Sequence, residues 1–158
     1  MLDTIRHIEV FSAAAFGELR IDVIGAGATG SKIALGLAKL GITNIHVWDF
    51  DVIEPHNIPN QLYGLNHVKV DPETPIFKVN ALQAIIKEQT GATITIHNEK
   101  VDGTQRLGDI VFLLTDTMAS REEIWRKGIR YKAHVKLMIE TRMGHNNGRV
   151  YTVKPSVP

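Results

Sequence analysis

The run Gly25-Ala26-Gly27-Ala28-Thr29-Gly30 places three glycines at the spacing G-x-G-x-x-G. It follows a short β-branched segment, residues 20–24, and precedes residues 29–40, whose apolar side chains repeat with a helical period. In such a strand–turn–helix unit the first glycine makes the tight turn and the second lets the backbone approach a phosphate. The third lets the helix pack closely on the strand. The pattern predicts a nucleotide site at a helix N-terminus, with a ligand-free glycine-rich turn as the alternative.

Helical and extended segments alternate along the rest of the chain. The periodicity of apolar residues predicts helices over 4–16, 29–40, 76–90 and 118–130, and strands over 20–24, 44–48, 92–97, 109–114, 135–140 and 149–153. This alternation is typical of an α/β fold with a doubly wound, mostly parallel sheet and a Rossmann-like nucleotide-binding half. No repeat or linker divides the sequence, so we expect residues 1–158 to form one domain. The stretch 50–75, rich in proline, is predicted to be a functional loop.

The composition excludes several classes of protein. Lys and Arg number 18 against 17 Asp and Glu, and this formal net charge of +1 argues against a nucleic-acid or membrane-surface partner. The chain has no cysteine, which excludes disulfides, Cys-based zinc sites and a thiol nucleophile. No apolar run approaches the ~18–20 residues that cross a bilayer, and the first residues do not form a signal peptide. A cytoplasmic protein is therefore expected.

A carboxylate lies at the end of the second predicted strand. Asp49 comes about 20 residues after the last glycine of the motif, where an acid accepts hydrogen bonds from ribose hydroxyls. A solvated turn aspartate is the alternative reading of this position. Because a dehydrogenase would use the same residue, the glycine motif and Asp49 together leave the chemistry open between NAD, FAD, SAM and ATP.

The residues that follow carry a more specific pattern. The run from Trp48 to Gln61 resembles the signature of the ThiF/MoeB/HesA family, the adenylating domain shared with ubiquitin-activating enzymes. The matching positions are Asp49, Asp51, Glu54, Asn57 and Gln61, with Ile58 in place of the usual Leu. Three later segments are similar to family segments as well: 76–82, 113–117 and the pair 140–144 and 148–153. Because these motifs occur in order over nearly the whole chain, their conjunction is specific although each alone is weak.

The resemblance implies an ATP- and Mg²⁺-dependent adenylyltransferase. Its substrate would be the C-terminal carboxylate of a small ubiquitin-like or sulfur-carrier protein, activated as an acyl-adenylate. Lys78 would contact the ATP phosphates, and Asp116 would lie near magnesium and the reacting phosphate, which makes both catalytic. The residues implied to hold the nucleotide are Gly25, Gly27, Gly30, Asp49, Asp51, Asn57, Asn60, Gln61 and Lys78. Adenylation requires a cation and a metal-binding carboxylate, here Lys78 and Asp116, because the site must neutralise a triphosphate and expel pyrophosphate.

The resemblance also implies a homodimer. In related enzymes the N-terminal helix of one subunit brings an arginine to its partner's phosphates, and Arg6 is the candidate here. Such an arginine matters because Asn60 stands where the family has Arg, so that one expected cation is missing. Arg20 and Arg142 are further candidates to replace it.

Alternatives remain open at several positions. Lys78 as a solvated surface residue and Asp116 as a helix N-cap are the simpler readings of those two side chains. Without cysteine, an activated carboxyl leaves as the acyl-adenylate or passes to another protein. A binding or regulatory module with reduced catalysis is the second functional hypothesis. An NAD-dependent oxidoreductase is the third. It is less favoured because the matches to the family at Asn57, Gln61, Lys78 and Asp116 would then be coincidental.

Overall fold

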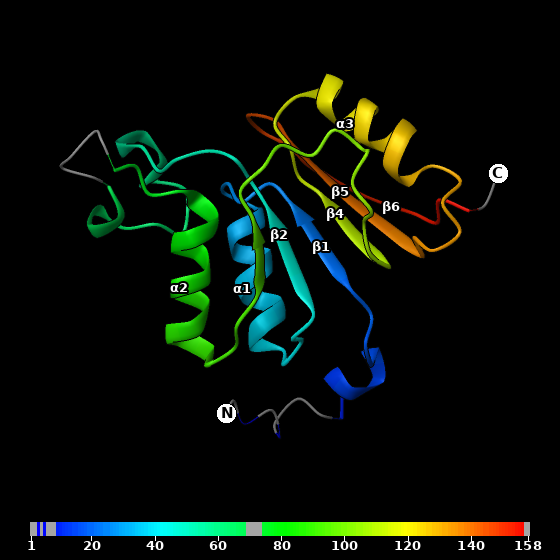
Figure 1. Cartoon of the computed structure of the whole chain (residues 1–158), viewed down its shortest axis with the longest axis horizontal. Helices are drawn as coiled ribbons and strands as arrows, with labels where there is room; N and C mark the ends of the chain where they lie inside the picture. Colours follow the sequence, from blue (N-terminus) through cyan, green and yellow to red (C-terminus); the bar gives the residue numbers. More distant parts are fainter. Residues whose placement is uncertain (1–2, 4, 6–8, 69–73, 157–158) are drawn as a thin grey trace.

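The computed structural model describes residues 3, 5, 9–68 and 74–156. Its elements in chain order are the 3-10 turn η2 (Ala13–Phe16), β1 (Ile21–Ile24), α1 (Gly30–Lys39), β2 (Ile45–Trp48), the 3-10 turns η3 (Pro55–Asn57) and η4 (Leu65–His67), α2 (Lys78–Thr90), β3 (Thr95–His97), β4 (Ile110–Leu113), α3 (Met118–Ile124), the π-helical turn η5 (Trp125–Ile129), β5 (Leu137–Met143) and β6 (Gly148–Val153) (Figure 1). No helix in these described ranges is both long and apolar enough to cross a bilayer.

The six strands form one sheet in the order β3-β2-β1-β4-β5-β6. Neighbouring strands are parallel except for β5 and β6, which pair as an antiparallel hairpin. Ile24 pairs in register with both Trp48 and Leu113, so the residues that follow these three emerge side by side at the carboxyl edge. The chain leaves β1 towards β2 and later returns to its other side at β4, which creates a crevice at this edge. The predicted doubly wound, mostly parallel sheet is confirmed.

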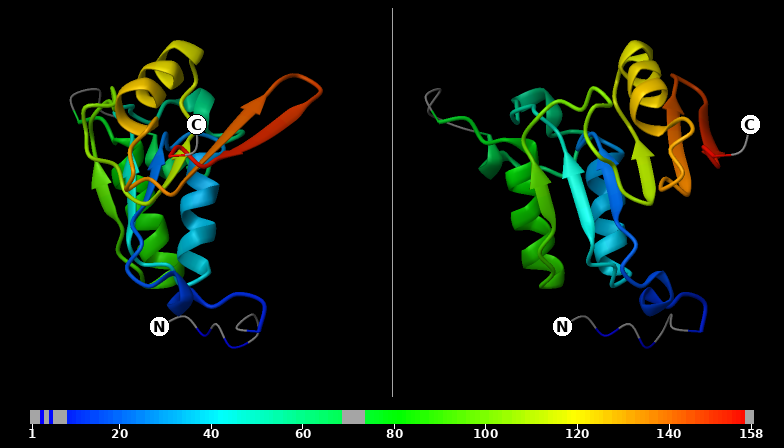
Figure 2. Two further views of the ribbon diagram at one scale, coloured as in Figure 1. Left: turned by 90° about the vertical axis from the view of Figure 1, so that its right-hand side faces the viewer. Right: turned by 45° about the vertical axis from the view of Figure 1, so that its right-hand side comes forward.

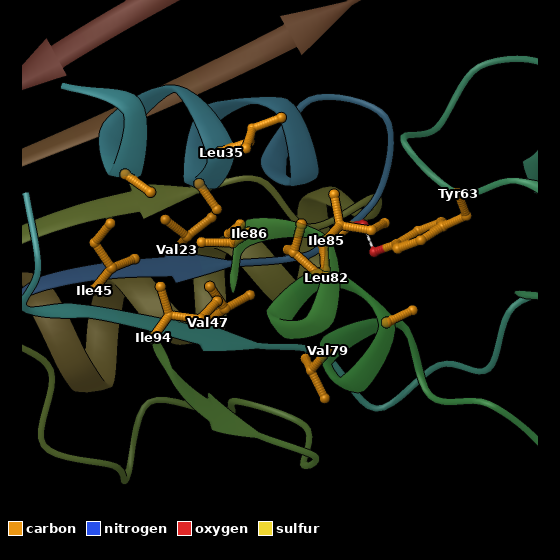
Figure 3. Packing of buried hydrophobic residues seen from close by; sticks show 14 of the residues in the cluster. Val23, Leu35, Ile45, Val47, Tyr63, Val79, Leu82, Ile85, Ile86 and Ile94 are labelled. Atoms are coloured by element: carbon orange, nitrogen blue, oxygen red, sulfur yellow. Dashed lines mark hydrogen bonds between the residues drawn. The ribbon is translucent and has the colours of Figure 1, made fainter. Parts of the chain in front are cut away.

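The two faces of the sheet carry separate apolar clusters, because successive strand residues point to opposite sides. Val23 belongs to the cluster under α1 and α2, whereas the adjacent Ile24 belongs to the cluster under α3 and η5. Figure 3 shows the first cluster, in which Leu82 and Ile86 of α2 lie against Val47 of β2. The helices therefore cover both faces and leave the carboxyl edge open.

The predicted helix over residues 4–16 is wrong where the structure describes it. Ala13–Phe16 form a short 3-10 turn and Ile5 is also in a 3-10 conformation, but residues 9–12 are not helical. Ile5, one of the apolar residues behind this prediction, is 70% exposed, whereas Phe11 packs against the cluster under α1 and α2 from a segment that is not helical. A short helix whose apolar face is only partly packed is marginal in water, which explains the difference. Arg6 and Ile8, which also belonged to this prediction, lie outside the described residues.

The other predicted elements are present, most with shorter bounds, whereas β5 runs on to Met143 and β6 begins one residue earlier, at Gly148. The helix expected over 118–130 is divided into α3 and the π-helical turn η5. The turn brings Gly128 against Gly103, where an added Cβ on Gly128 would lie 3.0 Å from the Gly103 Cα. Local widening of a helix is a common way to accommodate such a close backbone approach. The N-terminal turn η2 lies at the end of the sheet opposite the carboxyl edge of the strands (Figure 2).

Candidate active site

Two adjoining cavities open at the carboxyl edge of β1, β2 and β4. The first has a volume of about 420 Å³ and the second about 460 Å³, and both are lined by Asp51, Asn60, Gln61, Lys78 and Asp116. Gly25, Gly27 and Asp49 line the first cavity, and Asn57 lines the second. Gly30 lines neither cavity. The structure therefore gathers nearly all of the sequence-predicted site residues around one continuous space.

The three motif glycines are needed for different reasons. Gly25 has a left-handed φ of 102°, and an added Cβ there would lie 2.9 Å from the Leu114 carbonyl oxygen. A Cβ on Gly30 would overlap the carbonyl oxygen of Gly25. A Cβ on Gly27 would meet no protein atom within 4 Å, although Gly27 lines the cavity. Gly25 and Gly30 are thus required by the protein's own packing, while Gly27 keeps space free in the cavity.

Asp49 ties the glycine loop to the loop that follows β2. Its carboxylate accepts hydrogen bonds from the backbone N–H of Ala26 at 2.7 Å and of Asp51 at 2.8 Å. Burial raises the pKa of Asp49 above the usual aspartate value, although these two N–H donors and nearby Lys78 oppose the shift. The carboxylate lies in the cavity wall, and its contact with a ribose stays a prediction.

Tyr63 supports the glycine loop from outside the motif, and the sequence reasoning missed it. Its hydroxyl donates a hydrogen bond to the carbonyl oxygen of Ala26 at 2.7 Å, and the side chain is buried. Figure 3 draws this bond as a dashed line. Burial raises the pKa of the phenol, and the Asp49 charge adds to the shift. A single tyrosine in a proline-rich loop offers no periodic signal that would have identified this contact.

Lys78 begins α2 and points inward. Its ammonium lies 2.7 Å from the Asp51 carboxylate, and its backbone N–H donates to the Asp51 carbonyl oxygen at 2.9 Å. The Lys78 side chain is only 9% exposed, against 44% for Asp51. The simpler reading of Lys78 as a solvated surface residue is therefore wrong, because the structure holds a nearly buried cation in the cavity wall.

Asp116 is exposed at the start of α3 and does not cap the helix. The N-cap is Thr117, whose hydroxyl oxygen accepts a hydrogen bond from the Ser120 N–H at 3.2 Å. The N-cap reading of Asp116 is therefore wrong, and its carboxylate faces both cavities without a hydrogen-bond partner among the described residues. A free carboxylate at the cavity rim is available to a ligand or a metal ion.

Two buried polar atoms in the cavity wall have no partner in the part of the chain that the structure describes. They are the side-chain oxygens of Gln61 and Thr115. Buried polar groups are nearly always hydrogen-bonded, so each of these two oxygens leaves an unused acceptor in the cavity wall. Thr115 is a site residue that the sequence reasoning did not select, although it directly precedes Asp116.

Asn57 has a structural contact as well as a place in the second cavity. Its side-chain oxygen accepts a hydrogen bond from the Glu54 N–H at 3.0 Å, and its carbonyl oxygen accepts from the Gln61 N–H at 3.0 Å. The residue is buried, and it fixes the turn that brings Gln61 to the cavity. Any direct contact of Asn57 with a nucleotide stays a prediction.

Neither described arginine proposed to replace a cation at Asn60 lines these cavities. Arg20 is paired with Asp22 at 2.8 Å, and Arg142 is paired with Glu140 at 2.8 Å. Arg20 lies just before β1 and therefore at the opposite end of that strand from the glycine loop. The structure thus does not support either residue as the missing cation, and Arg6 lies outside the described ranges.

Comparison with known proteins identifies the family. The sequence matches the ThiF family over residues 5–157. The chain belongs to the ThiF family. A curated relative, the uncharacterised protein y4qC of Sinorhizobium fredii, is 48% identical over 46 residues, which is 29% of this chain and 8% of that protein. The family resemblance inferred from the motifs is therefore confirmed.

Solved structures of E. coli MccB share the fold of this ThiF-family chain. The structure of MccB with AMPCPP and MccA superimposes with a TM-score of 0.72 at 14% identity, over 90% of this chain and 43% of MccB. The structure of MccB with ATP gives a TM-score of 0.65 at 15% identity, over 82% of this chain and 38% of MccB. This chain thus spans less than half the length of MccB. At identities this low, the comparison shows a shared fold and nothing more.

Proposed function

We propose that this protein binds ATP with Mg²⁺ and transfers the adenylyl group to a carboxylate. The observation that carries the proposal is the arrangement of charges along one cavity. Asp49 and the glycine loop lie in one part of the wall, where a ribose and an α-phosphate would bind. Nearly buried Lys78 and free Asp116 line the part that the two cavities share. This arrangement fits a triphosphate whose reacting end lies beside a cation and a metal-binding oxygen.

The residues present fit magnesium supplied together with the nucleotide. Among the described residues, no three His, Asp or Glu side chains are grouped to hold an ion by themselves. Mg²⁺ is commonly bound by one or two carboxylates together with substrate phosphates and water. Asp116 would supply the protein oxygen, and the bound ion would neutralise charge on the leaving pyrophosphate.

The proposed reaction forms one bond and breaks one bond at the α-phosphorus. A carboxylate oxygen of the acyl donor attacks the α-phosphorus, and the bond from this phosphorus to the pyrophosphate oxygen breaks. The products are the acyl-adenylate and pyrophosphate. Lys78 would stabilise the negative charge as pyrophosphate leaves, and the backbone N–H groups at the start of α1 would hold the phosphates. No thioester forms in this chain, because it contains no cysteine.

We infer that the acyl donor is the C-terminus of a small protein or peptide, of the ubiquitin-like or sulfur-carrier kind. A groove of about 430 Å³ lies along α3, β5 and β6, with Met118, Trp125 and Val153 in its lining. Arg121 connects the groove to the active site, because its guanidinium donates to the Thr115 carbonyl oxygen at 2.6 Å. Apolar residues preceding a carboxylate would fit this groove. Solved structures of E. coli MccB together with MccA support a partner that binds to a protein of this fold.

The homodimer stays a prediction. Ile5 and Val10 expose apolar surface, which supports a protein interface near the N-terminal turn. The turn η2 lies at the opposite end of the sheet from the cavities (Figure 2). A contact of Arg6 with the active site of a second subunit stays a prediction.

A binding or regulatory module is the second candidate, and one observation favours it. The Lys78 charge is already paired with Asp51, and Asn60 adds no cation. Such a module would bind MgATP without turning it over.

Calorimetric titration with MgATP and with NAD tests the nucleotide assignment. We expect MgATP to bind more tightly, because the shared cavity wall places Lys78 and Asp116 where a triphosphate and its metal ion would lie. Tighter binding of NAD would contradict the proposal and revive the oxidoreductase hypothesis.

A further inference from the structure

The cavity wall contains more acidic than basic side chains. Asp49, Asp51, Glu99 and Asp116 line the first cavity together with two lysines, Lys78 and Lys100. The Lys78 charge is already compensated by Asp51 at 2.7 Å. A bound triphosphate would add several further negative charges. Even with a magnesium ion, this site therefore needs another cation near the terminal phosphates.

Lys100 is poorly placed to be that cation. It lies in the segment after β3, which is two strands away from β1 in the sheet order. The glycine loop follows β1, so Lys100 lines the side of the cavity beyond Asp49, where the ribose and base would lie. Its charge would therefore act on the nucleoside end rather than on the terminal phosphates.

Lys32 is exposed and lies in the first turn of α1, directly after the glycine loop. Its ammonium donates a hydrogen bond to the backbone carbonyl oxygen of Asn60 at 3.1 Å. Lys32 itself lines neither cavity, but Asn60 lines both, so this contact holds a positive charge next to their common wall, unlike the charges of Arg20 and Arg142, which are paired with carboxylates. Among the ion pairs formed by the described residues, none includes Lys32.

We propose that Lys32 binds the β- and γ-phosphates of ATP and replaces the arginine that the family pattern has at position 60. The inference rests on the proposed function and assigns a further residue of the same site. The Lys32 ammonium can exchange a neutral carbonyl for a charged phosphate oxygen without breaking an ion pair, and charge-assisted hydrogen bonds are the stronger kind. It also acts beside the α1 N-terminus, whose N–H groups favour anions. The positive charge that the family pattern has at residue 60 would thus be supplied here by Lys32 on the facing helix α1.

The test compares two lysines on the same helix. Lys39 is the last residue of α1 and is also exposed, so Lys39→Ala is the matched control for Lys32→Ala. Calorimetry measures the binding of MgATP and of AMP, which lacks the β- and γ-phosphates. We expect Lys32→Ala to weaken MgATP binding about tenfold, as the loss of one charge-assisted contact would. AMP binding should stay within about twofold of wild type, and Lys39→Ala should change neither ligand.

A second variant tests whether an arginine at residue 60, as in the family pattern, can replace Lys32. In the double variant Lys32→Ala/Asn60→Arg, a guanidinium at residue 60 should recover most of the lost MgATP affinity. Equal MgATP affinity of Lys32→Ala and Lys39→Ala would overturn the inference. Equal weakening of AMP and MgATP would also overturn it, because Lys32 would then act through the loop and not through the terminal phosphates. A wild-type protein that binds neither nucleotide would instead overturn the proposed function on which the inference rests.

Discussion

The glycine loop, residues 25–30, and the loop from Asp49 to Gln61 line the same cavity but are built differently. The first loop presents backbone to the cavity, and its shape depends on the absence of side chains at Gly25 and Gly30. The second loop presents side chains, which accept hydrogen bonds from its backbone N–H groups and, at Asp51, form the ion pair to Lys78. A substitution in the first loop therefore changes shape, whereas a substitution in the second changes charge and hydrogen bonding.

The largest expected effect is on the fold, at Gly30. In Gly30→Ala the new Cβ would overlap the Gly25 carbonyl oxygen, so the loop and α1 must separate. We expect a loss of about 3 kcal/mol or more in the free energy of unfolding, measured by urea denaturation. Gly36→Ala is the control on the same helix, because a Cβ there meets nothing within 4 Å and should stabilise by about 0.5–1 kcal/mol. Equal urea midpoints for the two variants would show that the close packing at Gly30 does not matter.

Gly27 should separate ligand binding from folding. In Gly27→Val the added Cβ meets no protein atom within 4 Å and the residue lines the cavity, so the free energy of unfolding should change by less than about 1 kcal/mol. MgATP affinity should fall by more than about 100-fold, because the side chain occupies the phosphate position. Calorimetry and urea denaturation on the same preparation measure both quantities. A variant that still binds MgATP like wild type would place the phosphates elsewhere.

The charged residues should affect the rate more than the binding. Lys78→Ala and Asp116→Asn should each lower the rate of ATP–pyrophosphate exchange by about 100-fold, because their charges act when pyrophosphate leaves. The dissociation constant of MgATP should rise by less than about tenfold. Lys87→Ala, an exposed lysine in the last turn of α2, is the matched control and should exchange like wild type. An unchanged rate in either site variant would remove that residue from the mechanism.

A smaller effect, on nucleotide affinity, is expected from the protonation of Asp49. Because burial raises this pKa, the carboxylate takes up a proton at a higher pH than an ordinary aspartate does as the pH falls. The ionised form is the better acceptor for ribose hydroxyls, so nucleotide affinity should fall with decreasing pH through this raised pKa. Asp49→Asn should bind more weakly at neutral pH, by about 1–3 kcal/mol, and should lose this pH dependence. An identical pH profile in wild type and variant would assign the titration to another group.

Local patterns in the sequence predicted the glycine loop, the place of Asp49 at the end of β2 and the parallel sheet. Each of these depends on a short spacing or on an alternation that neighbouring residues already display, whereas Lys78 was selected only through the family resemblance. Contacts between distant segments were not predictable in this way. Asp22, for example, is a single acid in a β-branched strand, yet it is buried and accepts hydrogen bonds from the Trp48 indole at 2.6 Å and the Gly108 N–H at 2.5 Å. Tyr63 escaped prediction for the same reason.

The N-terminal prediction failed for a different physical reason. The period of Ile5, Phe11 and Phe16 is helical, but a helical period becomes a stable helix only when its apolar face packs on a surface. Among the described residues Ile5 is exposed while Phe11 packs on the core, so the expected face is only partly covered, and residues 9–12 are not helical. Side-chain period therefore predicts structure best where the rest of the fold supplies the packing partner.

The most direct test of the proposed adenylylation is carrier-dependent ATP–pyrophosphate exchange. Wild-type protein, MgATP and labelled pyrophosphate are incubated with ubiquitin-like and sulfur-carrier proteins that end in a free carboxylate. The account predicts that label enters ATP only when a carrier is present, and that amidation of the carrier's C-terminus abolishes the exchange. Tight MgATP binding without carrier-dependent exchange, or exchange that survives amidation, would contradict it.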